Sequence, residues 1–136
     1  MKQFLLFLHQ LPQNLLGLIV YLFTNPRRLK CFFDNQWHYY YVAQRNKGGW
    51  GVSLGNFIFF GYEPDQLSIK HEYGHQIQSL YLGWLYLIVV GLPSAVFNNL
   101  WDRIFHKNWS HKKREQWYYN RYPEKWADKL GNVERF

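Results

Sequence analysis

Two long stretches of the chain contain no formally charged residue, and they limit the folds open to it. They span residues 3–25 and 76–101, and their apolar cores are residues 15–23 and 80–97. Segments of this kind are either buried in a protein core or enter lipid. Within the first stretch, residues 9–14 contain a proline and an asparagine that can cap a helix. We therefore expect one helix to end there and another to begin.

Between these stretches the pattern changes to that of β-strands. Residues 36–44 are aromatic and β-branched, and residues 50–54 and 56–60 can follow as strands with a bend at Gly55. We predict an α+β fold in which a small antiparallel sheet over residues 36–61 packs on the helix that follows. An exposed edge of such a sheet can bind an extended peptide, although a purely structural sheet would have the same pattern.

The five residues after Lys70 read H-E-x-x-H, with His71, Glu72 and His75 at the defined positions. Residues four apart on a helix lie on one face, so both imidazoles can bind a single zinc ion. Glu72 points to the side of that ion, where it can take a proton from zinc-bound water. A surface helix with two solvated histidines is the alternative.

The surrounding residues favour a packed helix. Asp65 or Ser68 can cap its start, and apolar residues before and after the motif can bury one side of it. Gly74 lies inside the helix, where glycine is about 1 kcal/mol less favourable than alanine. We therefore expect another part of the chain to pack closely against Gly74.

A zinc site that supports catalysis usually has a third protein ligand. The best candidate is Glu124, in the first turn of a short helix that begins after Pro123 and is capped by Gly131. Asp128 lies four residues further on, on the same face. One carboxylate can bind zinc while the other accepts the spare N–H of a ligand histidine. Taken alone, Glu124 could equally be a residue that complements the helix dipole.

A shared ion would also restrict the path of the chain. If residues 80–97 crossed a membrane with no return, His75 and Glu124 would lie on opposite sides of it. Residues 98–123 are too polar to cross back. We therefore predict a helical hairpin of residues 76–92 and 94–105 that turns near Pro93 and dips into one leaflet or packs in the core. The second limb has apolar residues at helical spacing, as in an interfacial helix: Phe97, Leu100, Trp101, Ile104 and Phe105.

An H-E-x-x-H motif followed at a distance by E-x-x-x-D resembles the gluzincin arrangement of metallopeptidases. The variants here, HEYGH and E-x-x-A-D-x-x-G, are most similar to the membrane-associated M48 and M56 group. The resemblance implies that His71, His75 and Glu124 bind Zn²⁺, that Glu72 is the general base and acid, and that Asp128 orients a ligand histidine. It implies a zinc-dependent endopeptidase of the bacterial inner membrane, acting on a peptide or protein by attack of zinc-bound water activated by Glu72.

Length and charge set further bounds. The 136 residues suit one metallopeptidase-like domain. Its expected parts are an apolar N-terminal helical segment over 1–30, the sheet, the motif helix and hairpin over 65–105, and a basic segment with the third ligand over 106–136. The net charge of +7 is explained more simply by a solvated face or anionic lipid than by nucleic acid. The lone Cys31 excludes an internal disulfide and a cysteine-based metal site.

Two other classes of function remain open. The zinc could be structural, in a small membrane scaffold or adaptor, and a basic nucleic-acid-binding module rests only on charge and aromatic content. Peptide hydrolysis would also need a donor for the developing oxyanion. Several residues upstream of Glu124 are weak candidates for that donor: His111, Tyr118, Tyr119, Arg121 and Tyr122.

Overall fold

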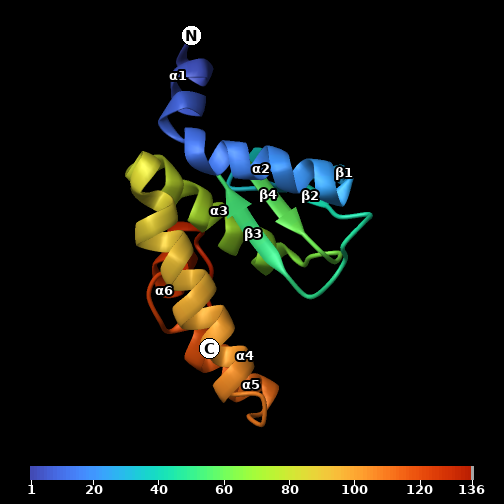
Figure 1. Ribbon diagram of the computed structural model, residues 1–136, viewed down its shortest axis with the longest axis vertical. Coiled ribbons are helices and arrows are strands. Elements are labelled where there is room, and N and C mark those ends of the chain that lie inside the picture. Colours follow the sequence, from blue (N-terminus) through green and yellow to red (C-terminus); the bar gives the residue numbers. More distant parts are fainter. Residues whose placement is uncertain (136) are drawn as a thin grey trace.

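A four-stranded sheet lies between two helices in the computed structural model, which describes residues 1–135 (Figure 1). Helix α2 packs on one face and helix α3 on the other. The fold is α+β, as predicted. In chain order the elements are α1 (Lys2–His9), α2 (Leu11–Thr24), β1 (Arg27–Phe33), β2 (Gln36–Val42), β3 (Gly51–Leu54), β4 (Phe57–Phe60), α3 (Gln66–Leu82), α4 (Trp101–Phe105), α5 (His111–Tyr119) and α6 (Glu124–Leu130).

The strand order is β1-β2-β4-β3, and the sheet is mixed. Strand β2 pairs with β4 in parallel, whereas β1 pairs with β2 and β3 with β4 in antiparallel fashion. The prediction of a purely antiparallel sheet is therefore wrong. Strand β3 is antiparallel to β2 but lies at the edge of the sheet. Its hairpin partner β4 therefore lies between β2 and β3 and is parallel to β2. Strand β1 was not predicted, and its first residues fall in the segment expected to be helical.

The two faces of the sheet pack differently. Phe33, Ile58 and Phe60 form the buried core with Ile69 of α3. On the opposite face, Gly17 of α2 lies so close to Phe57 that an added Cβ would be 2.5 Å from its ring. The sheet thus holds α3, which carries the H-E-x-x-H motif, in a fixed position.

The first apolar stretch forms two helices, as predicted. Helices α1 and α2 are bent by 87° at Gln10. Asn14 is not a cap, because it lies inside α2, donates to the carbonyl of Phe7 and accepts from the N–H of Asn56. Within residues 1–135, no one helix has both the length and the apolar character needed to cross a membrane, and only the bent α1–α2 pair meets that test jointly.

The chain turns back at Gly83 and not at Pro93. Gly83 follows α3 with a φ of +54°, and short helical segments at Gly83–Leu85, Leu87–Gly91 and Pro93–Leu100 then lead into α4. Residues 86–105 form one wide, partly π-helical run, called helix 86–105 below. Proline lacks the N–H that an α-helix would direct to the carbonyl of Val89. That carbonyl accepts from the Tyr122 hydroxyl at 2.5 Å, so Pro93 is tolerated within the helix.

Helices α3 and α6 cross in very close contact. Asp65 caps α3 by accepting from the N–H of Ser68 at 2.8 Å. A Cβ on Gly74 would lie 1.9 Å from the carbonyl oxygen of Ala127, and one on Gly131 would lie 2.0 Å from that of Lys70. The expected close packing at Gly74 is confirmed. Glycine at these two positions lets the two backbones approach far enough for side chains of α6 to reach the motif.

Candidate metal centre

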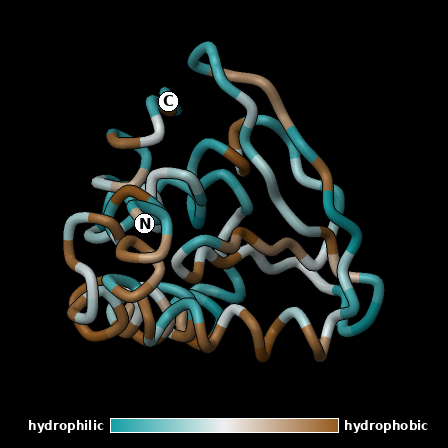
Figure 2. Tube along the Cα trace, turned by 90° about the horizontal axis from the view of Figure 1, so that it is seen from above, coloured by the Kyte–Doolittle hydropathy of each residue, from teal (hydrophilic) through white to brown (hydrophobic). Residues whose placement is uncertain are grey.

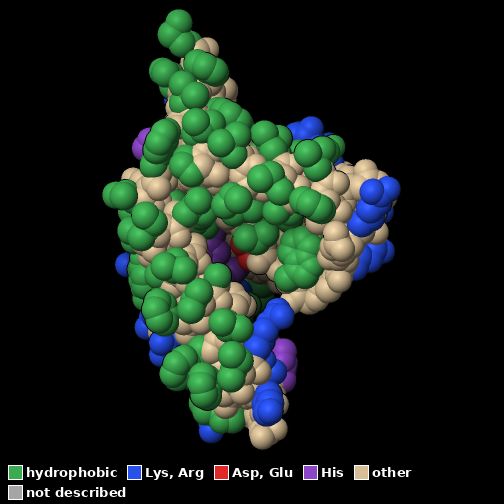
Figure 3. Space-filling model, viewed as in Figure 1, with side chains coloured by type: hydrophobic (Ala, Val, Ile, Leu, Met, Phe, Trp, Pro, Cys, Tyr) green, Lys and Arg blue, Asp and Glu red, His purple; other side chains and the backbone are tan. Residues whose placement is uncertain are grey.

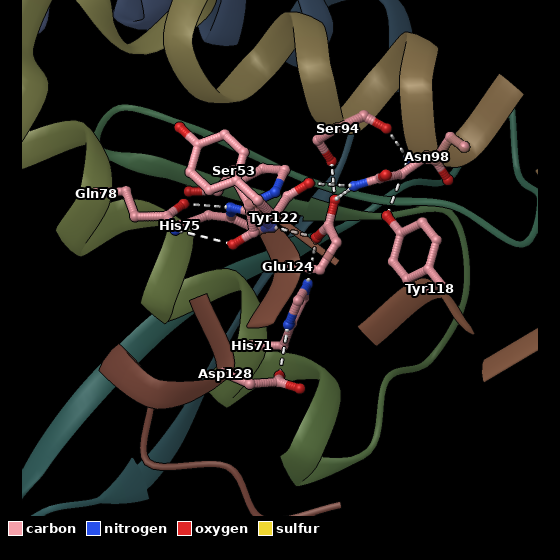
Figure 4. A network of polar contacts seen from close by, with 12 residues as sticks. Ser53, His71, His75, Gln78, Ser94, Asn98, Tyr118, Tyr122, Glu124 and Asp128 are labelled. Atoms are coloured by element: carbon pink, nitrogen blue, oxygen red, sulfur yellow. Dashed lines mark hydrogen bonds and ion pairs between the residues drawn. The ribbon is translucent and has the colours of Figure 1, made fainter. Parts of the chain in front are cut away.

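Three buried side chains from α3 and α6 converge on one point (Figure 4). One carboxylate oxygen of Glu124, Oε2, lies 3.1 Å from Nε2 of His71 and 2.9 Å from Nε2 of His75. The three potential ligand atoms all lie within 4.8 Å of one another. The predicted convergence of the motif with Glu124 is confirmed.

The second nitrogen of each imidazole is also held. Nδ1 of His71 lies 2.7 Å from a carboxylate oxygen of Asp128, as predicted for the residue four positions after Glu124. Nδ1 of His75 lies 2.7 Å from the amide oxygen of Gln78, whose amide nitrogen donates to the carbonyl of Pro123. These contacts direct both Nε2 atoms towards Glu124. Gln78 was not predicted, although its position three residues after His75 places it on the same helical face.

The other oxygen of Glu124, Oε1, is bound from helix 86–105. The Ser94 hydroxyl donates to it, and the Asn98 amide donates at 3.3 Å and also reaches the carbonyl of Tyr122 at 3.0 Å (Figure 4). Ser94 and Asn98 were missed in the sequence. Their signal is a pair of polar residues four apart within a largely apolar helix, a spacing that places both on one face of it.

Glu124 and Asp128 keep negative charge next to the two imidazoles. Burial tends to raise the pKa of Glu124, but the adjacent histidines outweigh it and hold that pKa well below the ordinary value. Burial tends to lower the pKa of His71, but hydrogen bonds to Asp128 and Glu124 raise it to about 9. This arrangement of paired, buried groups strongly favours a positive charge between the carboxylates.

Glu72 is buried beside this group and differs from the other acidic residues. Its Oε2 atom has no hydrogen-bond partner within the described chain. Burial raises the pKa of its carboxyl, and the neighbouring histidines offset only part of that effect. Gly51 of β3 allows the close approach of the strand, because a Cβ there would lie 3.1 Å from Oε1 of Glu72. An unpaired buried carboxylate oxygen is costly and therefore indicates a missing polar partner.

The group opens into a cleft rather than being closed off. Two adjoining hollows of about 450 and 240 Å³ share Gly51, Glu72, Asn99 and Tyr118 in their walls. The larger hollow reaches His71, and the smaller one reaches His75 between β3 and helix 86–105. Glu72 thus faces space in which a substrate and a water molecule can lie.

The five candidate oxyanion donors are distributed unequally. Tyr118 lines both hollows, and its hydroxyl accepts from the Asn99 amide at 3.0 Å, which leaves its own proton for donation. Burial raises its pKa well above the ordinary value, so the hydroxyl stays protonated. Tyr119 and His111 line only the larger hollow. Arg121 donates to Asn98 and stacks on Trp117, and the Tyr122 hydroxyl donates to the carbonyl of Val89. Neither residue lines a hollow.

The donor set fits a divalent transition metal. Two imidazoles and one carboxylate lie in a buried arrangement, each already oriented by a second hydrogen bond, and an unpaired carboxylate oxygen lies next to them. Imidazole and carboxylate together suit zinc and neighbouring first-row metals. His71, His75 and Glu124 could therefore hold a metal ion. Comparison with known protein families, characterised proteins and solved structures found no match for this chain.

Proposed function

We propose that the protein is a membrane-associated, zinc-dependent metallopeptidase of gluzincin type. The observation that carries this proposal is the unpartnered, buried Oε2 of Glu72 beside a buried three-residue donor set that an open cleft reaches at His71 and His75. Three protein ligands leave a fourth position free, as in catalytic zinc sites. A structural zinc site is closed by four protein ligands, so the open cleft favours hydrolysis over the scaffold role.

Each residue would have a defined part in the reaction. A Zn²⁺ ion held by His71, His75 and Glu124 would supply a Lewis acid that lowers the pKa of water towards about 7 and polarises a carbonyl. Glu72 would take the proton of the attacking water and pass it to the nitrogen of the scissile bond, which then leaves as an amine. Glu72 suits both transfers because its Oε2 atom has no hydrogen-bond partner within the described chain and its side chain lines both hollows. The Tyr118 hydroxyl would donate to the developing oxyanion.

The outer edge of the sheet at the start of β3, where Gly51 is exposed, would bind the peptide. The carbonyl of Trp50 accepts from the N–H of Gly61, so the backbone groups of Trp50 point towards the chain that continues β4. Because antiparallel pairs alternate, Gly51 and Ser53 direct their backbone groups away from β4, along the free edge. Strand β3 is an outer strand and lines the smaller hollow. Gly51 is exposed, whereas Ser53 is buried and its carbonyl already accepts from the Tyr86 hydroxyl at 3.1 Å. An extended peptide would therefore pair with β3 at Gly51, beside Glu72.

The test is cleavage by the zinc-loaded chain and its Glu72→Gln variant. The substrate is a pool of peptides of mixed sequence dispersed in detergent micelles, and new termini are identified by mass spectrometry. The wild-type chain should cleave, and E72Q should lose at least about 1,000-fold in rate with zinc content unchanged. Glu63→Gln is the matched control, because Glu63 is exposed, pairs with Arg27 and lines neither hollow. Cleavage by E72Q at the wild-type rate, or none by either chain, would refute the proposal.

A further inference from the structure

The outward sides of α1, α2 and helix 86–105 form one broad hydrophobic surface, called the apolar face below. Figure 3 shows it as a continuous green area, and Figure 2 shows the hydrophobic segments gathered along one side of the molecule. Helix α1 buries none of its residues against the rest of the chain. Among the exposed members are Leu22 at 76%, Ile88 at 67% and Leu92 at 52% of their possible surface. A patch of this size on a soluble monomer marks an interaction site.

The helices under this face have their polar residues inside. In α2 the buried side chains include Gln13 and Asn14, whereas its leucines and isoleucine point outward. Gln13 donates to Ser79 and to the carbonyl of Gly83, and Ser79 donates to Gln10. This is the reverse of a helix that borders water. A medium that offers no hydrogen bonds favours such an arrangement, because most of these polar groups then find partners within the protein; among the described residues, Oε1 of Gln13 has none.

The candidate site opens in the middle of the apolar face. In Figure 3 histidine and acidic side chains are visible at the bottom of a hollow surrounded by green side chains. The smaller hollow explains this view, because it lies between β3 and helix 86–105 and reaches His75 and Glu72. Whatever covers the apolar face therefore also stands at the entrance to the site.

The charges around the face point to a lipid surface as its occupant. In Figure 3 lysine and arginine side chains lie at the borders of the face, and the acidic groups in view lie in the hollow. The net charge of +7 complements anionic headgroups. A second copy of the chain would bring its own lysine and arginine side chains against those at the borders of the face, and it would close the hollow. Fluid lipid, in contrast, can be displaced by a substrate.

We infer that the apolar face sits in one leaflet of an anionic bilayer and that the cleft takes its peptide from within that leaflet. The substrate class is then a polypeptide whose cleaved segment adjoins a lipid-embedded helix. This inference about the substrate rests on the proposed hydrolysis, whereas the placement of the cleft in lipid stands apart from it. Extended backbone needs hydrogen-bond partners at that depth, and the outward backbone groups of the exposed Gly51 on β3 can supply them.

Vesicle flotation tests the occupant of the face. The full chain is mixed with vesicles of phosphatidylcholine and phosphatidylglycerol, and the floating fraction is measured. The double variant Leu22→Glu, Leu92→Glu should lose at least tenfold in partition. Trp37→Glu, which alters an equally exposed apolar residue on β2, should bind as the wild type does. A wild-type chain that forms a dimer and stays off the vesicles would overturn the inference.

Fluorescence quenching tests the position of the cleft without any need for activity. In a Cys31→Ser background, a fluorophore is attached to a cysteine at Ala95, which is exposed and lines the smaller hollow. A second chain carries the fluorophore at Lys129, which is exposed on α6, behind helix 86–105 in Figure 1. Lipids brominated along the acyl chain should quench the first label at least threefold more than the second. Equal or reversed quenching in the vesicle-bound chain would overturn the inference.

Cleavage of paired peptides tests the substrate class. A quenched ten-residue peptide is taken from the sequences cleaved in the mixed pool and is also made with an attached leucine-alanine helix of about 20 residues, long enough to anchor it in vesicles. The anchored form should be cleaved at least tenfold faster by the vesicle-bound chain, and not by E72Q. Equal rates would overturn the inference but leave hydrolysis in place. No cleavage of either form, with the label at position 95 quenched, would refute hydrolysis and the substrate class while supporting the placement in lipid.

Discussion

Replacement of Gly74 by alanine should separate the two halves of the metal centre. Gly74 is where α3 and α6 cross, and an added Cβ would lie 1.9 Å from the carbonyl oxygen of Ala127. Ordinary contact begins at 3.4 Å, so the helices must move apart by about 1.5 Å at this point (3.4 − 1.9). The obstacle is backbone, which cannot rotate aside as the end of a side chain can. Glu124 starts α6 and would move with it, away from His75, from which it is now 2.9 Å distant.

The expected size of the effect follows from that displacement. Overpacking of a well-packed contact destabilises by about 1–3 kcal/mol, and a backbone obstacle places Gly74→Ala at the upper end, about 3 kcal/mol. A domain of this size should then lose about 10 °C in melting temperature. A shift of more than 1 Å in one of three ligands should lower zinc affinity at least about 100-fold. Thermal unfolding by circular dichroism and zinc titration of the metal-free chain measure the two effects.

Gly91→Ala is the matched control, because the same substitution in helix 86–105 makes only ordinary contacts, the nearest with Leu87 at 3.6 Å. It should raise stability by up to about 1 kcal/mol through the higher helix propensity of alanine, with zinc affinity unchanged. If Gly74→Ala binds zinc as tightly as Gly91→Ala and melts at the same temperature, the close crossing of α3 and α6 does not set the geometry of the site, and the reasoning fails.

Three further predictions concern zinc affinity and stability. Asp128→Ala removes the carboxylate that orients His71 and should weaken zinc binding about 10–100-fold, measured by competition with a chelator. Because the pKa of His71 is raised to about 9 in the metal-free chain, zinc must displace a proton below that pH; affinity should rise with pH up to about 9, and a flat profile from pH 6 to 9 would contradict the assignment. Asp65→Ala removes the cap of α3 and should lower the free energy of unfolding by about 1 kcal/mol at pH 7. Since the hydrogen bonds from Ser68 hold the pKa of Asp65 below 3.8 in the folded chain, this difference should persist above pH 3.8 and shrink as the pH falls below it; urea unfolding at several pH values checks it.

Local signals in the sequence predicted much of the fold. The cap at Asp65, the Pro123–Gly131 frame of α6 and the bend at Gly55 each depend on residues within a few positions of one another. The turn at Gly83 could not be predicted, because Pro93 is the stronger local breaker. Pro93 can nevertheless lie within a helix, because the hydroxyl of Tyr122, which is distant in sequence, donates to the carbonyl of Val89. The parallel pairing of β2 with β4 is likewise a property of the tertiary fold.

The same distinction applies to the candidate site. Two fixed spacings, H-E-x-x-H and E-x-x-x-D, predicted the residues that meet, because each describes one face of one helix. The groups that hold Glu124 from the other side, Ser94 and Asn98, belong to a third helix whose orientation depends on the turn at Gly83. Without that turn, their side chains had no predictable partner. The free edge of β3 also became evident only from the strand order.

Zinc K-edge X-ray absorption on the zinc-loaded chain tests the central claim most directly. Two imidazole nitrogens and at least two oxygens should surround one zinc ion at about 2.0–2.2 Å, one oxygen from Glu124 and one from exchangeable solvent. The Glu124→Ala variant should lose one oxygen ligand or bind no zinc. A spectrum with sulfur at about 2.3 Å, with fewer than two imidazoles, or unchanged in Glu124→Ala would contradict a centre built from His71, His75 and Glu124.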